Sequence, residues 1–160
     1  MTEPRFTIEP ARARTDLLAV ADLFRAYANS LPIDLDYQGF EAELSTLPGK
    51  YAQPIGEILL AKNELSEPIG CVAVRPFDEQ GCCEMKRLYV CPQGRGMGLG
   101  SQLVKAILSE AQKIGYKEMR LDTLSTMAEA LALYEKFGFT RIPAYYETPI
   151  ENTVFMSKKL

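Results

Sequence analysis

The sequence has 160 residues, 18 basic and 21 acidic side chains, a formal net charge of −3 and no histidine. A chain of this length can enclose its own hydrophobic core, and we expect one domain over residues 1–160. The absence of histidine excludes Ser-His-Asp triads, Cys-His nucleophile pairs and metal sites that depend on imidazole. Any general base must therefore be a carboxylate, a lysine, a tyrosine, a cysteine or a water molecule.

Charge, hydropathy and cysteine spacing limit the partners that we expect. The mild acidity disfavours nucleic acid, because proteins that bind duplexes carry a basic surface. The first residues lack the features of a secretory signal, and no apolar run approaches the ~20 residues that span a membrane. The cysteines form no Cys-x-x-Cys pair, so we expect cytoplasmic, reduced thiols and no metal centre; they are Cys71, Cys82, Cys83 and Cys91.

The first part of the chain predicts one strand and two helices. Alternating apolar residues indicate a strand over 5–10. Apolar residues at helical spacing predict a helix from about 16 to 29, with Thr15 as its N-cap. A shorter helix is expected from about 37 to 47, where Pro48-Gly49 ends it.

Three strands should follow, and then an alternation of helices and strands. Short polar turns join the three strands, which predicts an antiparallel meander over 57–62, 69–75 and 82–91. Beyond them we expect helices over about 97–115 and from Thr126 to Gly138, with strands over 118–124, 139–142 and 153–159. The T-x-x-E sequence at Thr126 predicts a capping box. The order β-α-α-β-β-β-α-β-α-β-β indicates an α/β domain with a mixed sheet.

A glycine-rich segment joins the third meander strand to the next helix. Free N–H groups and the positive end of the helix dipole make such a helix start an anion site, and glycines let phosphate oxygens approach the backbone. The spacing fits neither a Walker A loop nor a strict dinucleotide fingerprint. It satisfies R-x-x-G-x-G as Arg95-x-x-Gly98-x-Gly100. We expect a phosphate or pyrophosphate ligand; the alternative is a turn without a ligand.

Two separated motifs resemble those of the GNAT superfamily of acyl-CoA-dependent N-acetyltransferases. The first is the R-x-x-G-x-G loop after a strand ending Leu88-Tyr89-Val90-x-Pro92, and the second is A-x-x-L-Y-x-x-x-G-F over 130–139. The resemblance implies a mixed sheet of about seven strands with flanking helices, which opens beside the strand that precedes the loop. It implies acetyl-CoA as co-substrate, no metal, and cofactor contacts from Leu88, Tyr89, Val90, Arg95, Gly96, Met97, Gly98, Leu99, Gly100 and Ser101.

One position departs from the family pattern. Many members have asparagine where this chain has Met127, and that asparagine bonds the cofactor arm. Methionine cannot donate a hydrogen bond. Ser125, Thr126 or a backbone group would have to supply this contact.

The reaction needs a base and an acid. An amine with a pKa near ~10.4 is almost entirely protonated at pH 7. Glu84 is the expected base, directly or through a water; it matches a strand glutamate with this role in some family members, and strand alternation predicts that it shares a face with Val90. The alternative is an ion pair with Lys86. By the resemblance, Tyr134 protonates the departing thiolate; the alternative is a core tyrosine. The Val90 N–H is the expected donor to the oxyanion.

The sequence indicates the acceptor substrate less clearly than it indicates the cofactor. Lys86, Arg87 and Tyr145 are the expected substrate contacts, and further candidates are Arg75, Arg141, Tyr27, Tyr37 and Tyr146. Surface or core roles are the alternative for each of them. We expect acetyl transfer to the primary amine of a small, amino-acid-like molecule. The alternatives are a non-catalytic acyl-CoA sensor, a protein or peptide N-acetyltransferase, and another nucleotide-binding α/β domain, which the glycine spacing disfavours. Monomer and homodimer remain equally open.

Overall fold

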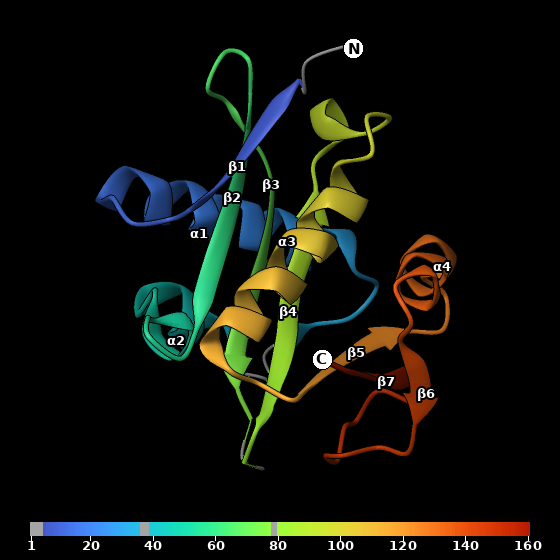
Figure 1. Cartoon of the computed structure of the whole chain (residues 1–160). Helices are drawn as coiled ribbons and strands as arrows, with labels where there is room; N and C mark the ends of the chain where they lie inside the picture. The colour runs from blue at the N-terminus through green and yellow to red at the C-terminus, as the bar shows by residue number, and fades with distance from the viewer. Residues whose placement is uncertain (1–4, 36–38, 78–79) are drawn as a thin grey trace.

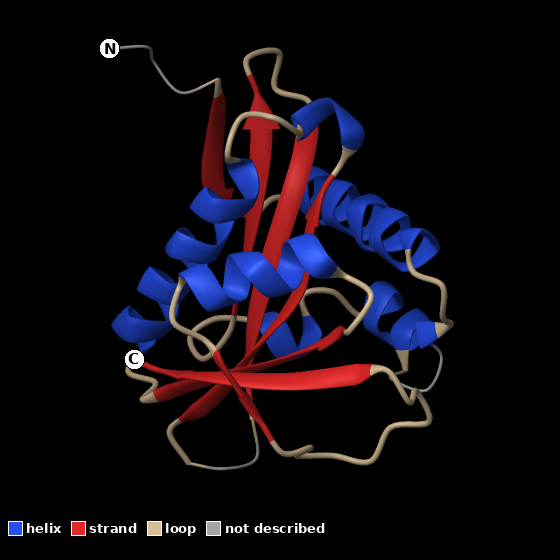
Figure 2. Ribbon diagram, turned by 90° about the vertical axis from the view of Figure 1, so that its right-hand side faces the viewer, coloured by secondary structure: helices blue, strands red, loops and turns tan. Residues whose placement is uncertain are grey.

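The computed structural model describes residues 5–35, 39–77 and 80–160. Its seven-stranded sheet has the order β1-β2-β3-β4-β5-β7-β6, with helices on both faces (Figures 1 and 2). The strands are β1 (Phe6–Pro10), β2 (Glu57–Asn63), β3 (Pro68–Pro76), β4 (Cys82–Val90), β5 (Glu118–Leu124), β6 (Thr140–Ile142) and β7 (Thr153–Lys159). The helices are α1 (Arg14–Ser30), α2 (Phe40–Ser45), α3 (Leu99–Ile114) and α4 (Ala128–Lys136), with 3-10 turns η2 (Gly49–Tyr51) and η3 (Pro92–Gly94).

The predicted mixed sheet and meander are confirmed. Strands β1 to β4 pair antiparallel in chain order, and β5, β7 and β6 also pair antiparallel. The contact between β4 and β5 is parallel, and α3 makes the crossover that a parallel pair requires. The glycine-rich loop therefore follows β4 beside the parallel contact between β4 and β5, where the sheet is expected to open.

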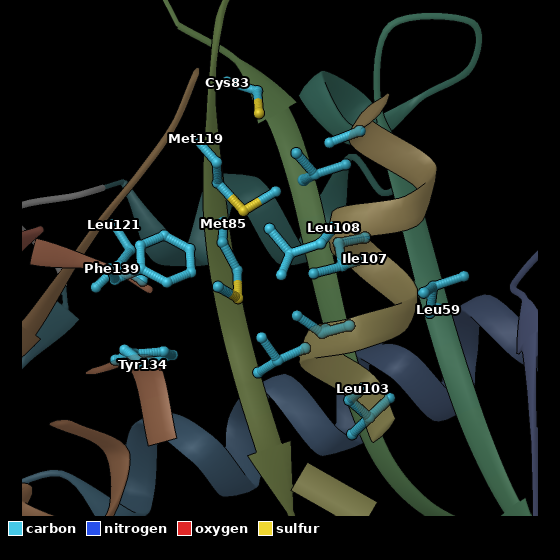
Figure 3. Close-up of a cluster of buried hydrophobic side chains, with 14 of the residues drawn as sticks. Leu59, Cys83, Met85, Leu103, Ile107, Leu108, Met119, Leu121, Tyr134 and Phe139 are labelled. Atoms are coloured by element: carbon cyan, nitrogen blue, oxygen red, sulfur yellow. The ribbon is translucent and has the colours of Figure 1, made fainter. Parts of the chain in front are cut away.

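Two hydrophobic clusters cover the two faces of the sheet. Helix α3 packs its apolar stripe on one face, and Figure 3 shows Ile107 and Leu108 on the side of the helix that faces Met85 and Met119. On the other face α1 and α2 contact alternate residues of the same strands, such as Leu60 and Ala73. None of the helices in the described ranges combines the length and hydropathy needed to cross a membrane.

Two predictions about helix starts are wrong, and a third helix is shorter than predicted. Helix α1 begins at Arg14 with Ala13 as N-cap, so Thr15 already lies inside it. Helix α4 begins after Met127, and no side chain caps it, because Met127 N–H bonds to Leu124 and places Thr126 in the preceding turn. Helix α2 covers only Phe40–Ser45; the predicted start at residue 37 lies outside the described residues. The C-terminal signal is confirmed, since Gly138 follows α4 with φ +92°.

A bulge in β4 overturns the predicted face of Glu84. Cys71 pairs with Tyr89 whereas Ala73 pairs with Lys86, so β4 carries one additional residue, and Arg87 adopts φ +63°. An additional residue reverses the alternation of side chains.

The reversal shows in the packing on either side of the bulge. Before it, Cys83 and Met85 belong to the α3 cluster, which turns Glu84 to the opposite face. After it, Val90 packs against the α3 cluster. Glu84 and Val90 therefore lie on opposite faces of the sheet, contrary to the prediction.

Strands β4 and β5 separate soon after they meet. Their pairing covers only Cys82–Glu84 against Glu118–Arg120. Beyond Glu84 the two strands diverge, and α4 lies on the far side of the gap from α3 (Figure 1). The gap is a break in the ladder of backbone hydrogen bonds that the rest of the sheet maintains.

Candidate active site

A pocket occupies the gap between β4 and β5; we call it the slot. It is lined by Tyr27, Met85, Lys86, Arg87, Leu88, Asp122 and Tyr134. Met85, Leu88 and Tyr134 pack with the α3 cluster, whereas Tyr27 packs with the α1 cluster. The slot therefore connects the two faces of the sheet. An adjoining pocket shares Tyr27, Arg87 and Asp122 and continues along the apolar residues Leu31, Ile33, Leu35, Leu124 and Met127.

The edge of β4 beside the slot offers backbone groups. Cys91 N–H donates to Ile69 O at 2.9 Å, so it faces β3. Neighbouring N–H groups along a strand point in opposite directions, which turns the Val90 N–H toward the slot. The segment Leu88–Val90 can thus pair with an extended arm in the manner of an added strand.

The glycine loop presents an open anion site at the start of α3. Gly96 and Gly98 have φ of +85° and +73°, and a Cβ built on either meets no atom within 4 Å. Gly98 is the N-cap, and no side chain caps the helix. The first-turn N–H groups are therefore open to an anion. Lys136 Nζ lies 3.5 Å from Ser101 Oγ, which adds a cation that the sequence analysis did not identify.

Tyr134 stands in the slot wall on the α4 side. Its ring lies edge-on to Phe139 with centroids 5.9 Å apart, and both are labelled in Figure 3. Burial raises the pKa of Tyr134, and the charges of Tyr27 and Asp122 raise it further. The phenol therefore stays protonated at neutral pH and is available as a proton donor.

Glu84 lies at the closed end of the gap and is 2% exposed. Its Oε1 accepts hydrogen bonds from Arg75 Nε at 3.0 Å and Nη2 at 2.9 Å. Its Oε2 accepts a hydrogen bond from Tyr145 OH at 2.6 Å. Arg75 thus forms an ion pair with this carboxylate, whereas the ion pair of Lys86 is with Asp122.

The expected acceptor contacts Lys86 and Arg87 are both paired with carboxylates. Lys86 Nζ lies 3.8 Å from Asp122 Oδ2. Arg87 contacts Glu43 through Nε at 2.9 Å and Nη2 at 3.0 Å, and its guanidinium lies over the Phe40 ring. Burial lowers the pKa of Lys86, although Asp122 and Glu84 oppose this effect.

A segment between β6 and β7, residues 143–152, carries two neighbouring tyrosines that each reach a carboxylate. Tyr145 donates to Glu84, as described, and Tyr146 OH donates to Asp122 Oδ2. We call this segment the strap. The other candidate, Arg141, is exposed, and Tyr37 lies outside the described residues.

The position that departs from the family pattern has no strong polar partner. Met127 lies at the start of α4, where its sulfur accepts a 3.7 Å hydrogen bond from Thr123 Oγ1. Ser125 and Thr126 are exposed beside it. In the described ranges, no three His, Cys, Asp or Glu residues are grouped so as to hold a metal ion.

Comparisons with known proteins cover nearly the whole chain. A sequence model of the acetyltransferase (GNAT) family matches residues 20–139. An uncharacterized N-acetyltransferase from Schizosaccharomyces pombe is 42% identical over 156 residues, which are 98% of this chain and 96% of that protein. The family match includes the slot strands, the glycine loop and Tyr134.

Solved structures share the fold. A crystal structure of a proposed acyl-CoA N-acyltransferase from Klebsiella pneumoniae has 31% identity and a TM-score of 0.76 over 99% of both chains. A proposed acetyltransferase from Salmonella typhimurium was solved with its cofactor acetyl-CoA. It has 22% identity and a TM-score of 0.68, and the match covers 97% of this chain and 94% of that chain.

Proposed function

Since this chain belongs to the GNAT family of acetyltransferases, we propose that it transfers an acetyl group from acetyl-CoA to the primary amine of a small molecule. The observation that carries the proposal is the slot, which joins an unpaired strand edge, an open helix start and a buried tyrosine. Acetyl-CoA supplies an acetyl group that is activated as a thioester. The amine attacks it directly, without an acetylated form of the protein.

The chain's own groups fit the three parts of this co-substrate. N–H groups from Gly96 to Ser101 bind the pyrophosphate, helped by Arg95 and Lys136. The open edge at Leu88–Val90 pairs with the extended arm, and Tyr89 is held between these positions. The Val90 N–H, which faces the slot, donates to the thioester oxygen as negative charge develops on it.

Tyr134 serves as the acid in this proposal. A thiolate with a pKa near ~8.5 accepts a proton from a phenol that the protein keeps protonated. The position of Tyr134 in the slot wall supports this role. Glu84 is the base expected from the sequence, and in this arrangement Tyr145 would have to relay the proton to it, because Arg75 and Tyr145 engage both of its oxygens.

A small acceptor agrees with the enclosed geometry. The strap covers the face of the sheet that is opposite α3, and the described pockets beside the slot are narrow. The cations expected to bind an acceptor's anionic group, Lys86 and Arg87, already have carboxylate partners. A test must therefore include amines with and without a carboxylate. The reduced thiols, among them those of Cys71 and Cys83, support a reducing compartment such as the cytoplasm.

The test is release of free thiol from acetyl-CoA across amino acids, alkylamines, arylalkylamines and a peptide, with mass spectrometry of the acetylated amine. We expect a small amine to be turned over, and Tyr134→Phe to lower kcat about 10²- to 10⁴-fold at saturating acetyl-CoA. The binding affinity for acetyl-CoA should change little, because the ring remains. Tight acetyl-CoA binding with no turnover would instead indicate a sensor, and turnover of the peptide alone a peptide acetyltransferase. An unchanged kcat in Tyr134→Phe would remove the acid role from this residue.

A further inference from the structure

Asp122 is the carboxylate that lines the slot. It comes from β5, the strand opposite β4, and it borders both the slot and the adjoining apolar pocket. Its side chain retains 14% exposure, whereas that of Glu84 retains 2%. The charge of Asp122 also reaches the phenol of Tyr134. The carboxylate of Asp122 and the candidate acid Tyr134 thus line the same pocket.

The contacts of Asp122 leave one of its carboxylate oxygens able to accept a proton from a bound amine. Within the described part of the chain, both of its side-chain polar contacts, from Lys86 Nζ and from Tyr146 OH, fall on Oδ2. Its Oδ1 therefore remains available to a ligand. Glu84 differs, because Arg75 engages one oxygen and Tyr145 engages the other.

The surroundings of Asp122 favour removal of a proton from a bound amine. Lys86 beside it disfavours a second positive charge, which favours release of a proton from an ammonium that binds in the slot. Tyr146 holds the carboxylate in place from the strap. Among the described residues, the titratable and charged groups near Asp122 come from β4, α1, α4 and the strap; they are Lys86, Arg87, Tyr27, Tyr134, Tyr145 and Tyr146.

We propose that Asp122 is the group that accepts the proton from the acceptor amine, in the same slot as Tyr134. This inference rests on the proposed acetyl transfer, and it assigns to Asp122 the role of general base that the sequence analysis gave to Glu84. The ammonium that arrives at pH 7 first gives one proton to Asp122, which holds it while the acetyl group is transferred. The C–N bond then forms from the nitrogen lone pair while the C–S bond breaks, and its electron pair leaves on sulfur. Tyr134 gives its proton to sulfur and regains one from the nitrogen of the new amide, and Asp122 then releases its proton to solvent.

The test compares Asp122→Asn, Glu84→Gln and wild type with the best amine of the panel. Without a protein base, only amine that is already neutral reacts, and this fraction rises about tenfold per pH unit up to a pKa near ~10.4. We expect Asp122→Asn to lower kcat/KM for the amine about 10²- to 10⁴-fold at pH 7. The deficit should shrink by about tenfold per unit as pH rises.

Controls separate this role from a structural one. Glu118→Gln changes another carboxylate on the same strand and face, paired with Arg120, and should keep wild-type kcat/KM and its pH profile. Acetyl-CoA affinity, measured by calorimetry, should be retained in Asp122→Asn. If Asp122→Asn unfolds because Lys86 has lost its partner, the double variant Lys86→Met/Asp122→Asn takes its place, since it removes both charges. The double variant should show the same pH-dependent deficit in kcat/KM.

Three results would overturn the inference. The first is kcat/KM within twofold of wild type in Asp122→Asn. The second is a deficit that does not diminish with pH. The third is the pH-dependent deficit in Glu84→Gln alone. If acetyl-CoA binds but no amine is turned over, the proposed function fails, and the assignment of Asp122 fails with it.

Discussion

Arg87 occupies the bulge in β4, and Glu43 of α2 holds its buried guanidinium. The two side chains are 2% and 12% exposed, and Tyr51 OH donates to the same carboxylate. The contact ties α2 to the strand that borders the slot. It fixes the bulge, because Arg87 adopts a left-handed conformation that a non-glycine residue rarely takes without tertiary support.

Removing the carboxylate should therefore be costly. We predict that Glu43→Ala lowers the free energy of unfolding by about 3–5 kcal/mol, because it leaves a buried cation without its partner. Urea denaturation measures this loss. The exposed pair of Asp22 and Arg25 is the control, and Asp22→Ala should cost no more than about 1 kcal/mol. An equally small loss in Glu43→Ala would show that the buried pair does not hold the strand.

At the residue scale, the sequence predicted the roles of individual residues better than it predicted which residues lie close together in space. Tyr134 was identifiable because its motif surrounds it, and the structure places it in the slot wall. Asp122 was missed, because nothing adjacent in sequence marks it; only the separation of β4 from β5 opens the slot that it lines together with Tyr134. Lys136 was missed for the same reason.

At the scale of elements, the glycine loop and α3 form the part of the site that local sequence determines most fully. Gly98 caps the helix in the left-handed region, where a side chain costs about 1–2 kcal/mol. A Cβ at this position meets no protein atom and would point into the space that we assign to phosphate.

Gly98→Ala should weaken acetyl-CoA binding by about tenfold or more, since one hydrogen bond to a charged group contributes about 1.5–3 kcal/mol. Calorimetry measures the affinity. Gly39→Ala is a matched control, because Gly39 also caps a helix, has φ +70° and is open on its Cβ side. Both variants should lose similar folding stability, but only the first should lose affinity; equal affinities would remove the pyrophosphate from this loop.

The regular strands and helices were predictable from the sequence, whereas the bulge in β4 and the residues at which helices begin were not. Strands β5 and β7 have the predicted bounds, because their alternation and flanking turns are local signals. The bulge depends on pairing with β3 and has no local signature, so the predicted face of Glu84 was wrong. The caps at Thr15 and Thr126 failed because backbone pairing, not the polar side chain, set where each helix begins.

At the scale of the whole molecule, the parallel junction between β4 and β5 organises the site. The crossover through α3 places the glycine loop at one end of the slot, and α4 brings Tyr134 to its wall. The seven-stranded mixed sheet was predictable from element order and the two motifs. The slot itself was expected only through the family resemblance.

The fold offers little for a covalent route. The sequence contains no histidine to activate a nucleophile. Three of the four cysteines, Cys71, Cys82 and Cys83, are buried, and burial raises the pKa of Cys83 to about 12; Cys91 is partly exposed, and no histidine can activate it. A thiol that stays protonated is a poor nucleophile. The acetyl group should therefore pass from acetyl-CoA to the amine in one complex.

Initial-rate kinetics with both substrates varied, combined with the intact mass of protein incubated with acetyl-CoA alone, tests this claim most directly. We predict intersecting double-reciprocal lines, which a ternary complex produces, and an unchanged protein mass. Parallel lines together with a protein that has gained one acetyl group would contradict direct transfer.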